Sequence, residues 1–266
     1  MLLPLPEPYD FELSTERFRA FGPDLANLWD DGTLLRAVDG REVRITAAPG
    51  GVDVEPLDDV VRPVIEKALG LEFELDPFYA WARGQPVLDE LAVRLAGFRP
   101  PLAPDPFESL VTSITAQQIS LFAAFKIRNR LIEAYGEPAG RAWAFPRRER
   151  IAAAEEPDLV ALGYSHRKAE YLVGLARDPI DLDELAGLGD NEVRARLTAI
   201  RGLGAWTAEW FLARHLARPR AWPAGDLGVR KAAQVFYGLD VNELGRRLDP
   251  FQNLSAHYLL VGMRVP

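Results

Sequence analysis

A reversal between two helix-like segments and a following aspartate carry the strongest chemical signal in this sequence. Residues 197–210 read LTAIRGLGAWTAEW, in which one amphipathic segment runs into Gly202-Leu203-Gly204 and continues at once as another. Such a reversal presents backbone N–H groups at a fresh helix N-terminus, which binds anions such as phosphate. Asp226 follows after a short gap, and a carboxylate stabilises developing positive charge. The spacing predicts a site that holds a phosphodiester strand beside a catalytic acid.

The predicted hairpin assigns a role to each of its residues. The two glycines permit the tight turn, and Leu203 is expected to fill the space between the helices. The amides of Gly204, Ala205 and Trp206 are expected at the start of the second helix, and Gly202, Leu203, Gly204 and Ala205 are the candidate contacts with the DNA backbone. A plain helical corner is the alternative, because Gly-x-Gly is common between helices. Asp226 has a structural alternative as a helix N-cap. The two roles of Asp226 are compatible, since a helix N-terminus favours an ionised carboxylate.

The overall composition is that of an ordinary soluble globular chain. Its 266 residues are 48% hydrophobic and 26% charged, and no apolar run approaches the ~20 residues of a membrane span. The N-terminus lacks a secretory pattern, so we expect a cytoplasmic protein with no membrane partner. The absence of cysteine excludes disulfides and a cysteine-bound iron–sulfur cluster. The three histidines show no metal-ligand spacing, so no metal is predicted.

The net charge of −8 argues at first against a nucleic-acid partner. The acidity is concentrated in residues 1–100, which hold 10 of the 31 basic and 19 of the 39 acidic residues. The remaining part of the chain is close to neutral and can present a local basic face. Net charge therefore neither excludes nor demonstrates binding to DNA.

The sequence predicts an α+β fold of two domains. Residues 1–97 form the first, because segments 33–38 and 41–47 flank the hairpin signal Asp39-Gly40 and 52–54 adds a strand. Residues 98–104 are a proline-rich linker, and residues 105–266 form an all-α domain. Helix signals lie at 58–69, 76–83, 87–97, 106–116, 120–135, 147–154, 156–162, 166–177, 190–200, 205–217, 227–237 and 254–263.

The hairpin, the Trp-Thr-Ala that follows it and Asp226 resemble the helix-hairpin-helix DNA glycosylases, most closely those that remove 3-methyladenine. The resemblance implies hydrolysis of the N-glycosidic bond of alkylated purines in duplex DNA by base flipping, with Asp226 as the catalytic aspartate. Members that also nick the strand carry a lysine where this chain has Trp206, so a monofunctional enzyme is implied. The resemblance further implies a TATA-binding-protein-like first domain, a monomer associated with the nucleoid, and a monovalent cation at the hairpin carbonyls, with no other cofactor.

The same resemblance implies an aromatic base pocket. Its walls map onto Trp206, Trp210 and Phe251. A further wall is expected near Arg17, which stands where an aromatic is usual and leaves Phe18 as the candidate. Alkylated purines are cationic, and a cation over an aromatic face gains ~0.5–2 kcal/mol. The alternative is that these aromatic side chains belong to the core.

Two further DNA contacts follow from the resemblance. The loop 114–120 matches an intercalation loop in which Gln118 takes the place of an apolar wedge. Lys168 lies in a loop and helix start that packs beside the hairpin and is a candidate phosphate contact. A solvated helix end and a solvated basic turn are the respective alternatives.

Two other functions stay open at this point. A non-catalytic binding module would use the hairpin alone and would need neither Asp226 nor an aromatic face beside it. A glycosylase for a neutral, oxidised or deaminated base would need hydrogen-bond donors aimed at the base edge. The sequence identifies no such donors.

Overall fold

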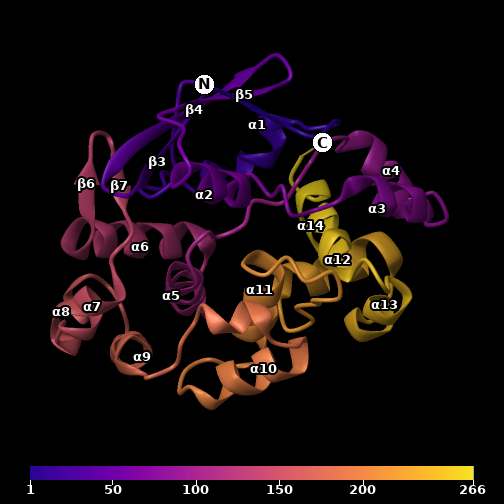
Figure 1. Cartoon of the computed structure of the whole chain (residues 1–266). Coiled ribbons are helices and arrows are strands. Elements are labelled where there is room, and N and C mark those ends of the chain that lie inside the picture. The colour runs from indigo at the N-terminus through magenta and orange to yellow at the C-terminus, as the bar shows by residue number, and fades with distance from the viewer. Residues whose placement is uncertain (266) are drawn as a thin grey trace.

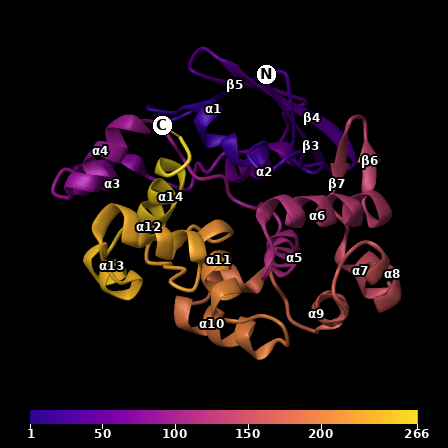
Figure 2. The ribbon, with the colours of Figure 1, turned by 180° about the vertical axis from the view of Figure 1, so that it is seen from behind.

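The computed structural model describes residues 1–265 and has the α+β architecture predicted from the sequence. An antiparallel sheet forms one end of the molecule, and helices form the rest, with α5 (Pro106–Ala116) and α11 (Ala205–Arg214) near the middle of the helical part (Figures 1 and 2). No helix among these residues is both long and apolar enough to cross a membrane.

The sheet has five strands in the order β1-β5-β4-β3-β2. The strands are β1 (Leu2–Pro4), β2 (Leu28–Asp30), β3 (Thr33–Val38), β4 (Arg41–Ala48) and β5 (Gly51–Glu55). Asp39 and Gly40 both have positive φ, 50° and 70°, as a two-residue hairpin turn requires. The alternating side chains Val43 and Ile45 are fully buried and form a core with α2 (Val61–Ala68), so the predicted hairpin is confirmed.

Two short helices precede strand β2, and helices account for most of the chain after residue 70. They are α1 (Phe11–Ser14), η1 (Glu16–Phe18), α3 (Leu75–Ala82), α4 (Pro86–Arg94), α6 (Leu121–Tyr135), α7 (Arg148–Ala152), α8 (Glu156–Ala161), α9 (His166–Arg177), η2 (Glu184–Gly187), α10 (Asp190–Ala199), α12 (Leu227–Tyr237), α13 (Val241–Arg247) and α14 (Gln252–Gly262). All the predicted helices are present within a few residues of their expected bounds. Strands β1 and β2, helix α13 and the short helices α1, η1 and η2 were not predicted, because each is short and gives little periodic signal.

The predicted domain boundary is misplaced. Helices α3 and α4 were assigned to the first domain, yet Phe78 and Leu91 belong to the same hydrophobic core as α5, α11 and α14. The core of the sheet ends instead at Leu69. Residues 98–104 are extended as predicted, but Phe98 and Leu102 are only 3% exposed. The proline-rich segment is therefore a buried strap within the molecule and not an exposed linker.

A second unpredicted element is a small hairpin of β6 (Glu137–Ala139) and β7 (Ala142–Ala144) within the helical part. It lies beside β3, where the amide of Trp143 donates to Leu25 O and the amide of Arg141 to Glu42. Figure 1 shows it rising from α6 toward the sheet. The hairpin therefore connects the helical part to the sheet, a contact that no local sequence pattern indicates.

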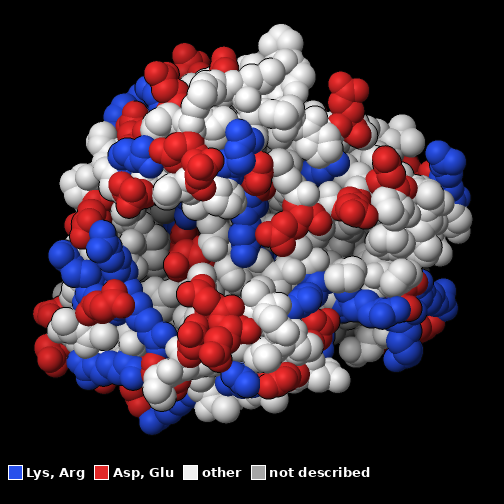
Figure 3. All heavy atoms as spheres, in the orientation of Figure 1, with Lys and Arg blue, Asp and Glu red and all other residues white. Residues whose placement is uncertain are grey.

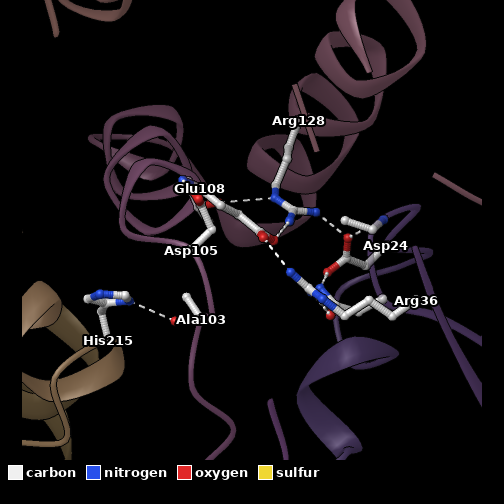
Figure 4. Close-up of polar contacts among 10 residues, drawn as sticks. Asp24, Arg36, Ala103, Asp105, Glu108, Arg128 and His215 are labelled. Carbon is white, nitrogen blue, oxygen red and sulfur yellow. Dashed lines mark hydrogen bonds and ion pairs between the residues drawn. The ribbon is translucent and has the colours of Figure 1, made fainter. Parts of the chain in front are cut away.

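Buried ion pairs join the sheet to the helices (Figure 4). Glu108 of α5 accepts from Arg36 of β3 and from Arg128 of α6, each across 2.6 Å. Arg128 also pairs with Asp24, and Arg36 donates to Asn27. All five side chains are at most 6% exposed. Because two arginines face two carboxylates, the buried charges balance, which is the condition for a stable buried network.

Candidate active site

The helical hairpin has the geometry that the sequence predicts. Helix α10 ends at Ala199 and α11 begins at Ala205. Gly202 has a φ of 92°, and a Cβ there would lie 2.2 Å from Cγ of Tyr171 on α9. Glycine is therefore required twice, by backbone conformation and by the close approach of α9. Leu203 is 3% exposed and packs in the core between the helices, as predicted.

The start of α11 offers unpaired amides. Ala208 is the first residue of α11 whose amide has a partner, Gly204 O at 3.1 Å. Within residues 1–265, the amides of Gly204, Ala205, Trp206 and Thr207 donate to no acceptor. The amide of Leu203 donates to Ile200 O, so Leu203 has no free amide to offer to a phosphate. The candidate anion site consists of these four free amides at the helix N-terminus.

Asp226 is the N-cap of α12 and lies beside the first turns of α11, to which it is hydrogen-bonded. Its Oδ1 accepts from the amides of Gly228 at 2.8 Å and Val229 at 3.2 Å. Its Oδ2 accepts from the indole Nε1 of Trp206 and of Trp210, each at 3.0 Å. The capping role and the site role therefore coexist, as the sequence suggested. The helix N-terminus and the four donors together stabilise the anionic carboxylate.

These contacts limit what Asp226 can do chemically. A carboxylate has about four lone-pair positions, and four N–H groups fill those of Asp226. No acceptor position remains for the proton of a water molecule unless an indole moves away. The arrangement is suited to stabilising positive charge on a neighbouring group without taking a proton.

A cavity of about 980 Å³ opens beside Asp226. Its volume lies at the upper end of the range of small-molecule sites. Its wall combines the hairpin, the N-terminus of α12, the loop before α6, the end of α14 and η1, and includes Arg17, Phe18, Gln118, Trp206, Trp210, Arg214, Asp226 and Arg264. The residues of the buried ion-pair network are also part of its lining. The structure thus brings together most of the residues predicted from the sequence.

Phe251 is an exception. It lies outside the lining of the cavity and packs against Phe78, at 5.8 Å between ring centroids, and against Trp81, at 5.2 Å. The predicted third pocket wall is therefore wrong, because the start of α14 turns this ring toward α3. Phe18 does line the cavity, although it is 8% exposed and belongs mainly to the sheet core.

One face of the Trp210 ring is covered by an arginine, which the sequence did not predict. The guanidinium of Arg214 lies over the ring, with Cζ 3.4 Å from the ring centroid. His257 packs edge-on against the same indole, at 5.6 Å between centroids. Trp210 lines the cavity as predicted, but the face of its ring under Arg214 is already in contact with a cation. Its role toward a cationic base stays a prediction. Arg214 was missed because its signal, an arginine four residues after a tryptophan on one helix, is frequent in ordinary helices.

The predicted intercalation loop lies at the rim of the cavity. Gln118 is exposed and has a φ of 58°, a left-handed conformation that turns the chain sharply between α5 and α6. The preceding Gln117 donates through Nε2 to Gly202 O at 2.9 Å and so connects the loop to the hairpin. Ile119 and Phe122 are exposed apolar side chains, 38% and 59% accessible. They add an apolar surface beside the polar wedge position. The apolar residues that follow Gln118, on either side of Ser120, are the signal that could have identified them.

Lys168 has a structural contact. Its ammonium donates to Thr115 O, the carbonyl near the end of α5, across 2.8 Å. Burial lowers its pKa from the ordinary lysine value. The ammonium has further N–H groups, so the contact of Lys168 with phosphate stays a prediction.

The hairpin also has free carbonyl groups. In the part of the chain that the structure describes, the carbonyl oxygens of Thr198, Ala199, Arg201 and Leu203 accept no hydrogen bond. Carbonyl oxygens are the ligands that hard cations prefer, so these residues fit the monovalent cation that the resemblance implies. Such an ion would add positive charge near the phosphate site. Among residues 1–265, no cluster of three or more His, Cys, Asp or Glu side chains could hold a metal.

Surface charge does not by itself mark a DNA-binding face. On the side shown in Figure 3, acidic and basic side chains are intermingled, and an acidic group lies between α9 and α11. The loop between α9 and α10 carries Asp178, Asp181, Asp183 and Glu184. The assignment of the strand-binding site therefore depends on the amides of the hairpin and not on a basic patch.

Comparison with known proteins agrees with this geometry. Residues 111–248 match the family described as HhH-GPD superfamily base excision DNA repair protein. This match covers more than half of the chain, and the chain belongs to that family. Among curated proteins, DNA-3-methyladenine glycosylase from Bacillus subtilis is 31% identical over 200 residues, which are 71% of this chain and 66% of that protein. The chain thus spans just under two thirds of that relative.

Solved structures extend the likeness to the whole chain. The 3-methyladenine DNA-glycosylase from Archaeoglobus fulgidus superposes with a TM-score of 0.90 at 28% identity, covering 100% of this chain and 99% of that one. The Schizosaccharomyces pombe 3-methyladenine DNA glycosylase Mag1, in complex with abasic DNA, gives a TM-score of 0.56 at 26% identity over 65% of this chain and 89% of that one. The sheet and the helical part together are therefore shared with a glycosylase.

Proposed function

We propose that this protein is a monofunctional DNA glycosylase that hydrolyses the N-glycosidic bond of alkylated purines in duplex DNA, with 3-methyladenine as the main base and 7-methylguanine as a second one. The observation that carries the proposal is Asp226, which is held by two indoles and two amides at the wall of a cavity beside the hairpin. The three relatives described above are each named as a 3-methyladenine DNA glycosylase, which supports the same base class.

The chemistry follows from the position of Asp226. When the bond between C1′ and the base breaks, the electron pair leaves with the base and the sugar becomes an oxocarbenium ion. A fixed anion beside C1′ stabilises that charge. Water then adds to C1′ and releases a proton to solvent, which yields an abasic site and the free base. A base that is cationic in the DNA leaves as a neutral molecule and needs no strong general acid.

The cavity supports the monofunctional assignment. A lyase step needs an amine that attacks C1′ and forms a Schiff base. The residues that line the cavity in the described chain include no lysine. Lys168 lies outside that lining and donates to a carbonyl of α5. Hydrolysis without strand cleavage is therefore the reaction that this set of side chains supports.

A binding module without activity is less consistent with the structure. Phosphate binding by the hairpin needs neither a carboxylate in the adjacent cavity nor two indoles that orient it. Asp226 and both tryptophans nevertheless meet in one hydrogen-bonded group. We infer further that the protein acts as a monomer on DNA in the cytoplasm.

The decisive experiment uses duplex DNA treated with a methylating agent. The protein is incubated with this DNA, and the released bases are identified by chromatography. We expect wild-type protein to release 3-methyladenine, and Asp226→Asn to bind duplex DNA while release falls by at least about a hundredfold, as for other lost transition-state contacts.

Asp240→Asn is the matched control. Asp240 caps α13 through the amides of Asn242 and Glu243 in the same way that Asp226 caps α12, but it is not in the cavity lining. Near-wild-type release by Asp226→Asn, or an equal loss in both variants, would overturn the catalytic assignment.

A further inference from the structure

Two serine side chains on α5 line the cavity without a hydrogen-bond partner. Within residues 1–265, the hydrogen-bonded side chains of α5 are Glu108, Thr112 and Thr115. Ser109, 7% exposed, and the half-buried Ser113 both belong to the cavity wall. The Oγ of Ser109 is not among the partnerless polar atoms that are sealed from solvent, so it is open to the cavity.

The neighbouring Thr115 shows the contact that a hydroxyl inside a helix can make. Its Oγ1 donates across 2.8 Å to the carbonyl four residues earlier. Ser109 and Ser113 make no such contact with the backbone of their own helix. Each hydroxyl therefore keeps its O–H donor and its acceptor positions free.

The two serines lie across α11 from Asp226. Helices α5 and α11 run side by side in opposite directions. Gln117 at the end of α5 donates to Gly202 O before α11, and the amide of Ala103 before α5 donates to Arg214 O at the end of α11. Figures 1 and 2 show α5 on one side of α11 and α12, which Asp226 caps, on the other. The hydroxyls and the carboxylate thus belong to facing walls of one cavity.

A purine whose sugar lies at Asp226 extends from that wall toward α5. The sugar is attached to N9 on the smaller ring, whereas the substituent at position 6 is attached to the larger ring. Ser109 and Ser113 are four residues apart, so they share one helix face and lie about 6 Å apart along the axis. A flipped base between the walls therefore turns its larger ring toward this pair of hydroxyls.

The charged groups on the same wall are already paired. Glu108 accepts from Arg36 and from Arg128, each across 2.6 Å. Thr112 accepts from Nε of Arg128 at 3.1 Å. The two serines are the hydroxyl groups of α5 that remain free for a ligand. Because they are neutral, they can contact a cationic methylated base without repelling it.

We propose that Ser109 and Ser113 hydrogen-bond the substituent at position 6 of the flipped base and so allow one pocket to accept both methylated purines. This inference rests on the proposed function. In 3-methyladenine the substituent is an amino group, which donates to a serine oxygen. In 7-methylguanine it is a carbonyl oxygen, which accepts from a serine O–H. A hydroxyl rotates to suit either partner, so one wall fits two bases with opposite hydrogen-bonding patterns.

The first test measures single-turnover release of both bases from methylated duplex DNA. For Ser109→Ala and for Ser113→Ala we expect each release to slow about 3-fold, and for the double variant about 10-fold, as for lost neutral hydrogen bonds. Ser255→Ala is the matched control, because Ser255 is also a buried serine without a partner but lies on α14 outside the cavity lining. Thermal unfolding shows that each variant is folded.

The second test uses a measurement that a purely structural role would leave unchanged. Free 3-methyladenine and free 3-methylpurine, which lacks only the 6-amino group, are added as competitors of the DNA. We expect 3-methyladenine to inhibit the wild-type protein about 3- to 10-fold more strongly, because only this base can donate to a serine. The two free bases should inhibit the double variant equally.

Slower release of both bases, together with loss of the difference between the two competitors, supports the inference. Unchanged release in the double variant overturns it, as does a loss confined to one base. Equal inhibition of the wild-type protein by the two competitors, or a difference that persists in the double variant, also overturns it. If wild-type protein releases neither methylated base, the proposed function itself fails and the inference falls with it.

Discussion

The indole N–H of Trp210 donates to Oδ2 of Asp226 across 3.0 Å, while its ring carries the guanidinium of Arg214 at 3.4 Å. One side chain thus contacts both an anion and a cation of the cavity wall. Trp206 donates to the same oxygen, so the carboxylate is held from two successive turns of α11.

Trp210→Phe separates these two functions. Phenylalanine keeps an aromatic surface under Arg214 but removes one donor to Asp226. Loss of one such hydrogen bond to a charged group costs about 1.5–3 kcal/mol, so we expect release of 3-methyladenine to slow by about 10- to 100-fold. Single-turnover kinetics on methylated duplex DNA provide the measurement. An unchanged rate would show that Trp206 alone positions Asp226.

The two hairpin glycines are expected to respond differently to alanine. Gly202→Ala places a Cβ 2.2 Å from Tyr171 at a positive φ, and we expect it to reduce the free energy of unfolding by about 1–3 kcal/mol. A Cβ at Gly204 would meet no atom within 4 Å, and the φ of −97° suits any residue. Gly204→Ala should keep its stability but weaken duplex binding, because the methyl group occupies space in front of the free amides. Chemical denaturation and DNA titration distinguish the two outcomes.

Glu108 is expected to contribute strongly to stability. Glu108→Gln leaves Arg36 and Arg128 buried beside a neutral amide, and breaking a buried ion pair costs about 3–5 kcal/mol. The matched control is Glu243→Gln, which removes an exposed pair with Arg247 and should change stability by no more than about 0.5 kcal/mol. Urea unfolding of both variants measures the difference. Similar losses would mean that the buried network is not a main connection between sheet and helices.

His215 predicts how stability depends on pH. Burial lowers the pKa of His215 to about 4, and its Nδ1 contacts Ala103 O. The unfolded chain takes up a proton near its usual pKa of about 6.5, whereas the folded protein does not. The contribution of neutral His215 to the free energy of unfolding is therefore fully present above about pH 6.5. It is lost as the pH falls toward 4, by roughly 3 kcal/mol.

His215→Asn should reduce this slope when the free energy of unfolding is measured between pH 7 and 4.5. His257, whose pKa is also lowered by burial, keeps the remaining part of the slope. A variant whose stability falls with pH as steeply as that of the wild type would contradict the assignment.

Local patterns predicted those parts of the site that depend on neighbouring residues. Gly202 and Asp226 were identified because a tight reversal and a helix cap each leave a short-range signature. The prediction for Phe251 was wrong because the direction of its ring depends on contacts with α3, which lies more than 150 residues earlier in the sequence. Arg214 was missed for a similar reason, since its environment includes η1 and α14 as well as its own helix.

The domain boundary shows the same limit at a larger scale. A proline-rich stretch such as residues 98–104 indicates an extended backbone, and the structure confirms that conformation. Whether an extended stretch is exposed depends on what packs against it, and here both Phe98 and Leu102 are buried. Composition predicts the conformation of this segment but not its partners.

The bond from Gln117 to Gly202 has a consequence for the search along DNA. This bond joins the predicted intercalation loop to the hairpin. We therefore expect the distance between the phosphate contact and the inserted side chain to be set before the protein binds DNA. With this distance preset, each binding position along the double helix would test one nucleotide, always at the same separation from the contacted phosphate.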